Sequence, residues 1–130
     1  MVIHVGLVGE ASQTVEPAQL ASAFGSGSIE VFATPALIAL MERAACQALE
    51  GQLSDTQTSV GTRIDVRHLA PTPLGVEVRA RAELIGIDGR TLVFRVEAFD
   101  PVEKIGEGTH ERAVVDATRL VAKATSKVSR

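Results

Sequence analysis

The sequence contains no tryptophan or tyrosine, and only four phenylalanines and one cysteine among its 130 residues. Few aromatic rings leave little surface on which bases could stack. The formal net charge of -3 also argues against the basic face that a general nucleic-acid binder would carry. One cysteine cannot form an internal disulfide, which fits a reducing compartment. We therefore expect a cytoplasmic protein that does not bind nucleic acid.

Long hydrophobic runs are also missing, because no apolar segment approaches the ~20 residues that a membrane-spanning helix needs. The first ten residues lack the basic segment and long apolar stretch of a signal peptide. With 45% hydrophobic and 22% charged residues, the composition is that of an ordinary globular protein. We expect one domain over residues 1–130 and no membrane association, with a tail from about 119 to 130 that could be flexible.

One apolar helix is predicted at Pro35–Glu50, with the sequence PALIALMERAACQALE. Thr34 is a suitable N-cap, and a proline at the first helical position loses no hydrogen bond. Gly51 suits a left-handed C-terminal cap. Almost all other positions are apolar, so most of the circumference should be covered. The stripe that should face water consists of Arg43, Gln47 and Glu50.

Glu42 is the one carboxylate on an apolar flank of this helix, between Ile38 and Ala39 on one side and Ala45 and Cys46 on the other. A carboxylate in such surroundings needs a partner, or its pKa rises. It could belong to a structural ion pair or act as a catalytic group. Cys46 could serve as a nucleophile, although a buried unreactive thiol is the simpler interpretation.

The segment before the helix contains weaker signals. Val2–Val8 alternates loosely and predicts a short strand, and Thr14 is expected to cap a helix from Val15 to about Ala23. Gly25–Ser28, with the sequence GSGS, is a flexible connector. These elements would lead into the central helix.

From residue 60 the apolar pattern has a period of two, which is typical of strands with one covered face. Asp88-Gly89 and Asp100-Pro101 mark turns between them. With only one long helix available to cover them, the predicted architecture is a curved antiparallel sheet wrapped around one helix. The residues expected to face the helix are Val60, Thr62, Ile64, Val66 and His68; Leu74, Val76, Val78, Ala80, Ala82 and Leu84; and Leu92, Phe94, Val96 and Ala98, with Gly61, Arg63, Asp65 and Arg67 on the opposite side of the first strand.

The last predicted strand, from about Lys104 to Thr118, leaves its orientation open. Glutamates alternate there with glycines, a histidine and an arginine. If Glu107 and Glu111 face water, then His110 and Arg112 face the helix, but a bulge would reverse this. In the first case, Glu42, His68 and His110 could meet at the rim of an apolar cavity and support hydrolysis. Two alternatives are a purely structural histidine at position 68 and a zinc site formed by these same side chains.

Three segments, VFATPALIALMERAACQAL, SVGTRIDVRHLAPTPLGVEV and GEGTHERAVV, together resemble the fluoroacetyl-CoA-thioesterase-like branch of the hotdog-fold acyl-CoA thioesterases. The match covers nearly the whole chain in order and spacing. The resemblance implies an α+β hotdog fold and homodimers, or higher assemblies, with acyl-CoA sites at the subunit interface. It places the catalytic set on Thr34, Glu42 and His68, and accessory roles beside the substrate on Gly61 and Arg112. The alternation of the last strand adds His110 to the predicted substrate-binding residues.

The function implied is hydrolysis of a small or medium acyl-CoA, with coenzyme A present only as part of the substrate and no metal. One departure from the family is Phe24–Ser28, where glycine and serine replace the aromatic residues of a lid, which predicts a more open acyl pocket. A non-catalytic acyl-CoA or small-ligand binding module, an enoyl-CoA hydratase or dehydratase, and a purely structural dimer remain as alternatives. Cations of the tail could meet coenzyme A phosphates or remain solvated, namely Arg119, Lys123, Lys127 and Arg130.

Overall fold

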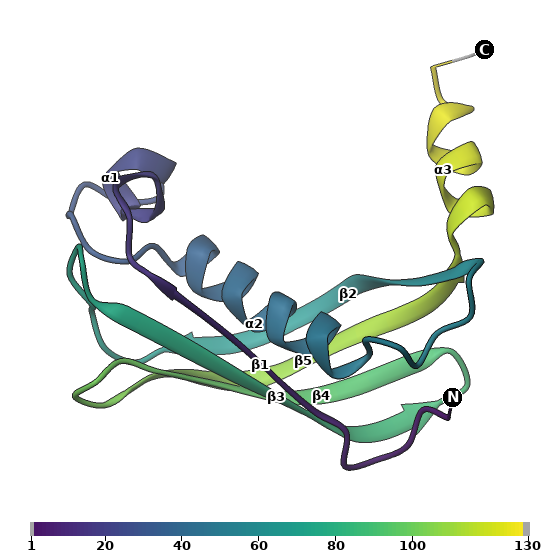
Figure 1. The fold of residues 1–130 in the computed structure, drawn as a ribbon. Coiled ribbons are helices and arrows are strands. Elements are labelled where there is room, and N and C mark those ends of the chain that lie inside the picture. Colours follow the sequence, from purple (N-terminus) through teal and green to yellow (C-terminus); the bar gives the residue numbers. More distant parts are fainter. Residues whose placement is uncertain (1, 129–130) are drawn as a thin grey trace.

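The computed structural model describes residues 2–128, in which one sheet curls around one long helix (Figure 1). The strands are ordered β1-β3-β4-β5-β2, and every neighbouring pair is antiparallel. The predicted architecture is therefore confirmed. The elements are β1 (Val8–Thr14), a 3-10 turn (Pro17–Gln19), α1 (Ala21–Phe24), α2 (Thr34–Ala48), β2 (Gln57–His68), β3 (Glu77–Asp88), β4 (Thr91–Phe99), β5 (Lys104–Asp116) and α3 (Ala117–Thr125).

The core lies between α2 and the concave face of the sheet. Leu37, Leu40 and Met41 are fully buried on the helix, opposite apolar side chains that alternate along β3 and β4. The inward residues predicted on these two strands are confirmed from Val78 onward, because each strand buries every second residue. Leu74 precedes β3 and is exposed.

The start of the chain differs from its prediction. The first strand is Val8–Thr14, not Val2–Val8, and the segment expected to form one helix contains a short 3-10 turn followed by α1. Thr14 is thus the last residue of a strand, not a helix cap. Both expectations relied on loose alternation and a capping residue, and such local signals are weaker than the pairing of β1 with β3.

A one-residue irregularity in β2 changes which side chains face the helix. Gly61 pairs with Arg112 and Arg63 pairs with Glu111, so Thr62 is an extra residue between them. Gly61 therefore faces the concave side, whereas simple alternation placed it outside, and Val60 turns to the outer side. Ile64 and the residues after it keep the predicted orientation.

In β5 the glutamates face away from the helix, which is the first of the two orientations considered above. His110 and Arg112 are buried on the concave side, with exposed fractions of 1% and 5%. The strand ends at Asp116, and the tail continues as α3, which rises at the opposite end of the molecule from α1 (Figure 1). Arg119 and Lys123 lie on this helix and Lys127 follows it, while Arg130 lies outside the described residues.

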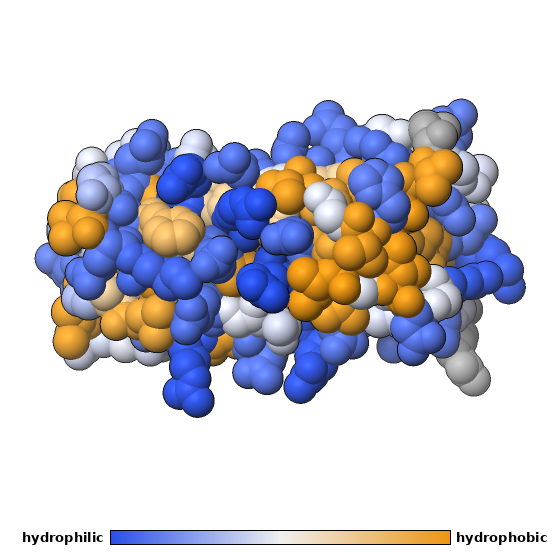
Figure 2. All heavy atoms as spheres, turned by 90° about the horizontal axis from the view of Figure 1, so that it is seen from below, coloured by the Kyte–Doolittle hydropathy of each residue, from blue (hydrophilic) through white to orange (hydrophobic). Residues whose placement is uncertain are grey.

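The outer face of the sheet is mainly hydrophilic, with its largest apolar area toward the end where the chain begins (Figure 2). Val5, Ile85 and Ile87 are exposed at this end of the sheet. None of the described helices is long and apolar enough to span a membrane.

Candidate active site

Thr34 and His68 form the first pair of interest, at the start of α2 and the end of β2. The hydroxyl oxygen of Thr34 lies 2.8 Å from Nδ1 of His68 and is hydrogen-bonded to it. Thr34 is the first helical residue, and Ala33 occupies the N-cap position without a side-chain cap. The predicted capping role of Thr34 is therefore wrong, because its hydroxyl is engaged by the imidazole. Pro35 is the second helical residue, one position later than predicted, because the helix begins at Thr34.

The other ring nitrogen of His68 is available for chemistry. Among the described residues, Nε2 has no hydrogen-bond partner although the atom is buried. An imidazole held at Nδ1 and unoccupied at Nε2 can accept or deliver a proton to a molecule placed beside it.

Glu42 belongs to a second group in the middle of α2. Its carboxylate oxygen Oε2 lies 3.7 Å from Nη1 of Arg112, and the two side chains are 39% and 7% exposed, respectively. The carboxylate thus has a cation partner and also an opening toward solvent. This arrangement combines the two interpretations of Glu42, since an ion-paired carboxylate that reaches solvent can still contact a substrate.

Arg112 is held by hydrogen bonds from two strands. Its Nε donates to the hydroxyl of Ser59 over 2.9 Å, and Nη2 donates to the carbonyl of the same residue over 3.1 Å. Nη1 lies 3.0 Å from Nε2 of His110. Because a guanidinium can only donate, His110 Nε2 must accept, so Nδ1 of His110 carries the proton and donates to the Arg63 carbonyl over 2.9 Å. Both ring nitrogens of His110 are therefore used within the protein.

Gly61 lies directly beneath this second group. A Cβ atom at this position would lie 2.6 Å from Oε2 of Glu42 and 3.2 Å from Cε1 of His110. The missing side chain therefore lets the carboxylate lie close against the backbone of Gly61, which is itself exposed.

The structure does not join the two groups within one chain. Thr34 and Glu42 are eight residues apart on one helix, which corresponds to about 12 Å along its axis. Among residues 2–128, no hydrogen bond or ion pair links the Thr34–His68 pair to the Glu42 group. The zinc alternative therefore lacks convergent ligands, and the described residues contain no group of three that could hold a metal.

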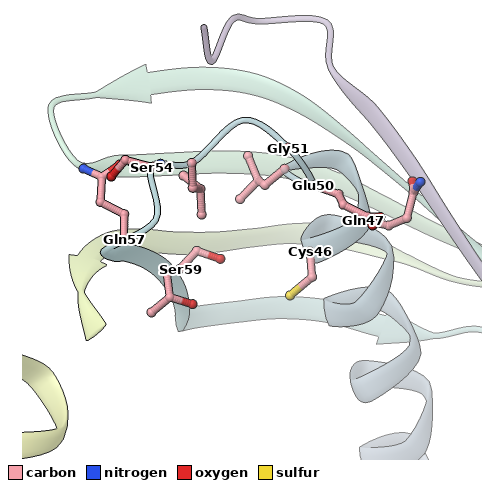
Figure 3. Close-up of a pocket in the computed structure, with 10 residues that line it drawn as sticks. Cys46, Gln47, Glu50, Gly51, Ser54, Gln57 and Ser59 are labelled. Carbon is pink, nitrogen blue, oxygen red and sulfur yellow. The ribbon is translucent and has the colours of Figure 1, made fainter. Parts of the chain in front are cut away.

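A pocket of about 430 Å³ adjoins the Glu42 group at the C-terminal end of α2 (Figure 3). Ser59 lines this pocket and also binds Arg112, so the pocket and the second group share a wall. Figure 3 shows Cys46 on the helix side of the pocket, one turn after Glu42. Cys46 is exposed, so the expectation of a buried thiol is wrong.

Burial lowers the pKa of His68 below its ordinary value of 6.5. Burial also lowers the pKa of His110, and the positive charge of Arg112 lowers it further. The hydrogen bond to the Arg63 carbonyl and the negative charge of Glu42 act in the opposite direction and raise the pKa of His110. The folded chain therefore binds fewer protons than the unfolded chain below pH 6.5.

It follows that acidification should destabilise the fold. We expect the free energy of unfolding to fall as the pH decreases from about 6.5 through the lowered pKa values of these two histidines. Urea titrations at pH 7.5 and 5.5 would measure this change. In His110→Gln, which cannot titrate, the difference between the two pH values should shrink. The exposed-residue variant His4→Gln should behave like the parent, and an unchanged pH dependence in His110→Gln would contradict the expectation.

Residues 15–118 match the family described as "Fluoroacetyl-CoA-specific thioesterase" (FlK). The chain is also 46% identical over 98 residues to the fluoroacetyl-CoA thioesterase of Streptantibioticus cattleyicolor, an alignment that covers 75% of this chain and 70% of that protein. The chain belongs to the fluoroacetyl-CoA-specific thioesterase family. It is therefore a thioester hydrolase that acts on acyl-CoA, and the resemblance seen in the sequence is confirmed.

Solved structures of this family share the fold. A structure of the fluoroacetyl-CoA thioesterase FlK superposes with a TM-score of 0.91 at 36% identity, covering 98% of this chain and 99% of that one. Variants of FlK have been solved with acetyl-CoA, and with fluoroacetate and CoA. A hot-dog-like protein from Thermanaerovibrio acidaminovorans superposes with a TM-score of 0.85 at 26% identity, covering 95% of this chain and 92% of that chain. The α+β hotdog fold is thus confirmed.

Sequence reasoning missed Ser59 as a residue of the site. Nothing in the residue pattern marks this serine, because its inward orientation depends on the extra residue at Thr62. The site residues predicted from the sequence fall into the two groups described above. The first group contains Thr34 and His68, and the second contains Glu42, Gly61, His110 and Arg112.

Proposed function

We propose that the chain hydrolyses small or medium acyl-CoA thioesters, with Glu42 as the essential carboxylate. The observation that supports this most is the position of Glu42, which reaches solvent beside a buried arginine and lies against the exposed backbone of Gly61. In this mechanism Glu42 activates a water molecule or attacks the thioester carbonyl directly, giving an acyl-enzyme anhydride.

The Thr34–His68 pair supplies the proton transfers. His68 protonates the departing thiolate, or acts as base on the water of a second step, through its unoccupied Nε2. Thr34 fixes the imidazole through the bond to Nδ1. Amides at the start of α2 and the backbone near Gly61 stabilise the negative charge that develops on the carbonyl oxygen.

We further propose that each site is assembled from two copies of the chain. Within one copy the two groups are separated by about 12 Å along α2, too far for both to contact one carbonyl group. β2 lies at an edge of the sheet, so its outer backbone groups can pair with β2 of a second copy. An antiparallel pairing centred between Ile64 and Asp65 places His68 of one copy opposite Gly61 of the other.

Mixing two inactive variants tests this arrangement. Glu42→Ala and His68→Ala are each expected to lose activity, but a mixed dimer would contain one site with both residues intact. Unfolding and refolding the two together should restore roughly a quarter of the native activity, because half of the dimers are mixed and one of their two sites is complete. If each chain holds its own complete site, the mixture should stay inactive.

The substrate is expected to be less restricted than fluoroacetyl-CoA. The segment from Phe24 to Ser28 carries glycine and serine, and its residues are exposed. Release of free thiol from acyl-CoAs of increasing chain length would measure this preference. Binding without thiol release would favour the non-catalytic module, and water addition to an enoyl-CoA would favour the hydratase.

A further inference from the structure

Arg112 is unusual in this protein because its charged group is buried and is restrained by hydrogen bonds to the neighbouring strand β2 and to its own strand β5. Only 7% of its side chain is exposed, and its ion-pair partner Glu42 is much more accessible. A buried guanidinium requires that its N–H groups are satisfied, since an unpaired buried charge is costly. The residues that satisfy them therefore decide where the charge points.

Two residues provide these bonds, and neither contacts Glu42 by a hydrogen bond or ion pair in the described chain. Ser59 of β2 accepts from Nε through its hydroxyl and from Nη2 through its carbonyl. His110 of β5 accepts from Nη1 and is itself fixed by its bond to the Arg63 carbonyl. The guanidinium is thus held along two of its edges, and Nη1 remains directed at Glu42 Oε2.

We propose that Ser59 and His110 are positioning residues that lock the Arg112 guanidinium against the Glu42 carboxylate, which lies over Gly61. The proposal rests on the proposed function, and it reassigns His110, which the strand pattern placed among the substrate-binding residues. His110 is 1% exposed and both of its ring nitrogens are engaged, so it acts through the arginine and does not contact the substrate.

The restraint has a chemical purpose in this arrangement. A cation fixed beside Glu42 holds the carboxylate in one orientation, and it can also balance charge that develops in the transition state. Without the Ser59 hydroxyl, Nε loses its acceptor, and the guanidinium can rotate away from Glu42. Misplacement of a reacting group by about 1 Å can cost ~100-fold in rate, so partial loosening should cost about tenfold.

Serine variants test the proposal. Ser59→Ala should reduce kcat for thiol release from acetyl-CoA about tenfold with little change in KM or melting temperature, and Ser59→Thr, which keeps the hydroxyl, should recover most of the rate. Ser12→Ala, at an exposed position on β1, is the matched control and should match the parent. A parental kcat in Ser59→Ala would overturn the proposal.

A double-mutant cycle shows whether the effect passes through Arg112. Ser59→Ala should have little further effect in an Arg112→Gln background, because the arginine that it positions is gone. Additive losses would overturn the proposal. The same reasoning applies to His110→Phe, with His110→Gln as the variant that keeps an acceptor for Nη1 and recovers activity.

A measurement that does not depend on catalysis tests this proposal separately from the proposed function. In the parent, the Arg112 Nε–H proton should give a distinct NMR signal that exchanges slowly with water, and Ser59→Ala should broaden or remove it while Ser12→Ala leaves it intact. If the parent chain releases no thiol from any acyl-CoA, the proposed function fails, and this signal alone decides the positioning role. A signal that is absent in the parent, or unchanged in Ser59→Ala, overturns it.

Discussion

Replacing Glu42 with glutamine is expected to lower kcat/KM for acyl-CoA hydrolysis about 100-fold or more. Glutamine has nearly the same shape, but it can neither accept a proton at neutral pH nor attack a thioester. The fold should survive, because this side chain is 39% exposed and is joined to Arg112 only by a contact of 3.7 Å. We expect the variant to remain folded, because Arg112 keeps its hydrogen bonds to Ser59 and His110.

The measurement is thiol release followed over a range of acyl-CoA concentrations, together with urea unfolding of the same preparations. Glu103→Gln is the matched control, since Glu103 is an exposed carboxylate in the turn between β4 and β5 and should leave the rate unchanged. Hydrolysis at the parental rate in Glu42→Gln would mean that another group performs the reaction, and the proposed mechanism would have to be abandoned.

A single added methyl group at position 61 should have an effect of similar size. In Gly61→Ala the new Cβ would lie 2.6 Å from Oε2 of Glu42, so the carboxylate must move. Because that atom is the end of a flexible side chain, it can move without disturbing the backbone. We therefore expect about 100-fold lower activity from the misplaced carboxylate, with a melting temperature close to that of the parent.

Gly86→Ala is the control for this substitution. Gly86 also lies next to a register shift in a strand, but a Cβ there would lie 3.7 Å from the nearest side-chain atom of Val93, which is an ordinary contact. Comparison of the two variants by thiol release and thermal unfolding separates the effect on Glu42 from the general effect of adding a methyl group to a strand. Equal activities in both variants would show that the position of the Glu42 carboxylate over Gly61 does not affect the reaction.

Much of the fold could be predicted because its strongest patterns are long. The central helix and the strands β3 and β4 each extend over many residues with consistent periodicity, and their buried residues match that pattern. β1 was misplaced for a physical reason. Its inward position Gly9 has no side chain, since a Cβ there would lie 2.2 Å from the Ala44 carbonyl oxygen, so close packing against α2 erased the hydrophobic signal.

The site was harder to predict than the fold. Residue types nominated Glu42 and His68, but alternation along β2 could not reveal that Gly61 faces the helix, because one unpaired residue reverses the order of sides. The two-group arrangement was also hidden, since it depends on how far Thr34 and Glu42 lie from each other along one helix. Distances of this kind follow from packing in three dimensions and not from residue types.

The extra residue at Thr62 also limits how this chain can vary in length. It allows Gly61 to lie under Glu42 while His68, seven positions later, still turns toward Thr34. Deleting one residue from β2 would keep either Gly61 under Glu42 or His68 toward Thr34, but not both. The turn after β4 could gain or lose residues without changing the orientation of Gly61 or of His68. An enzyme of this kind should therefore tolerate insertions in its turns but keep the length of this edge strand constant.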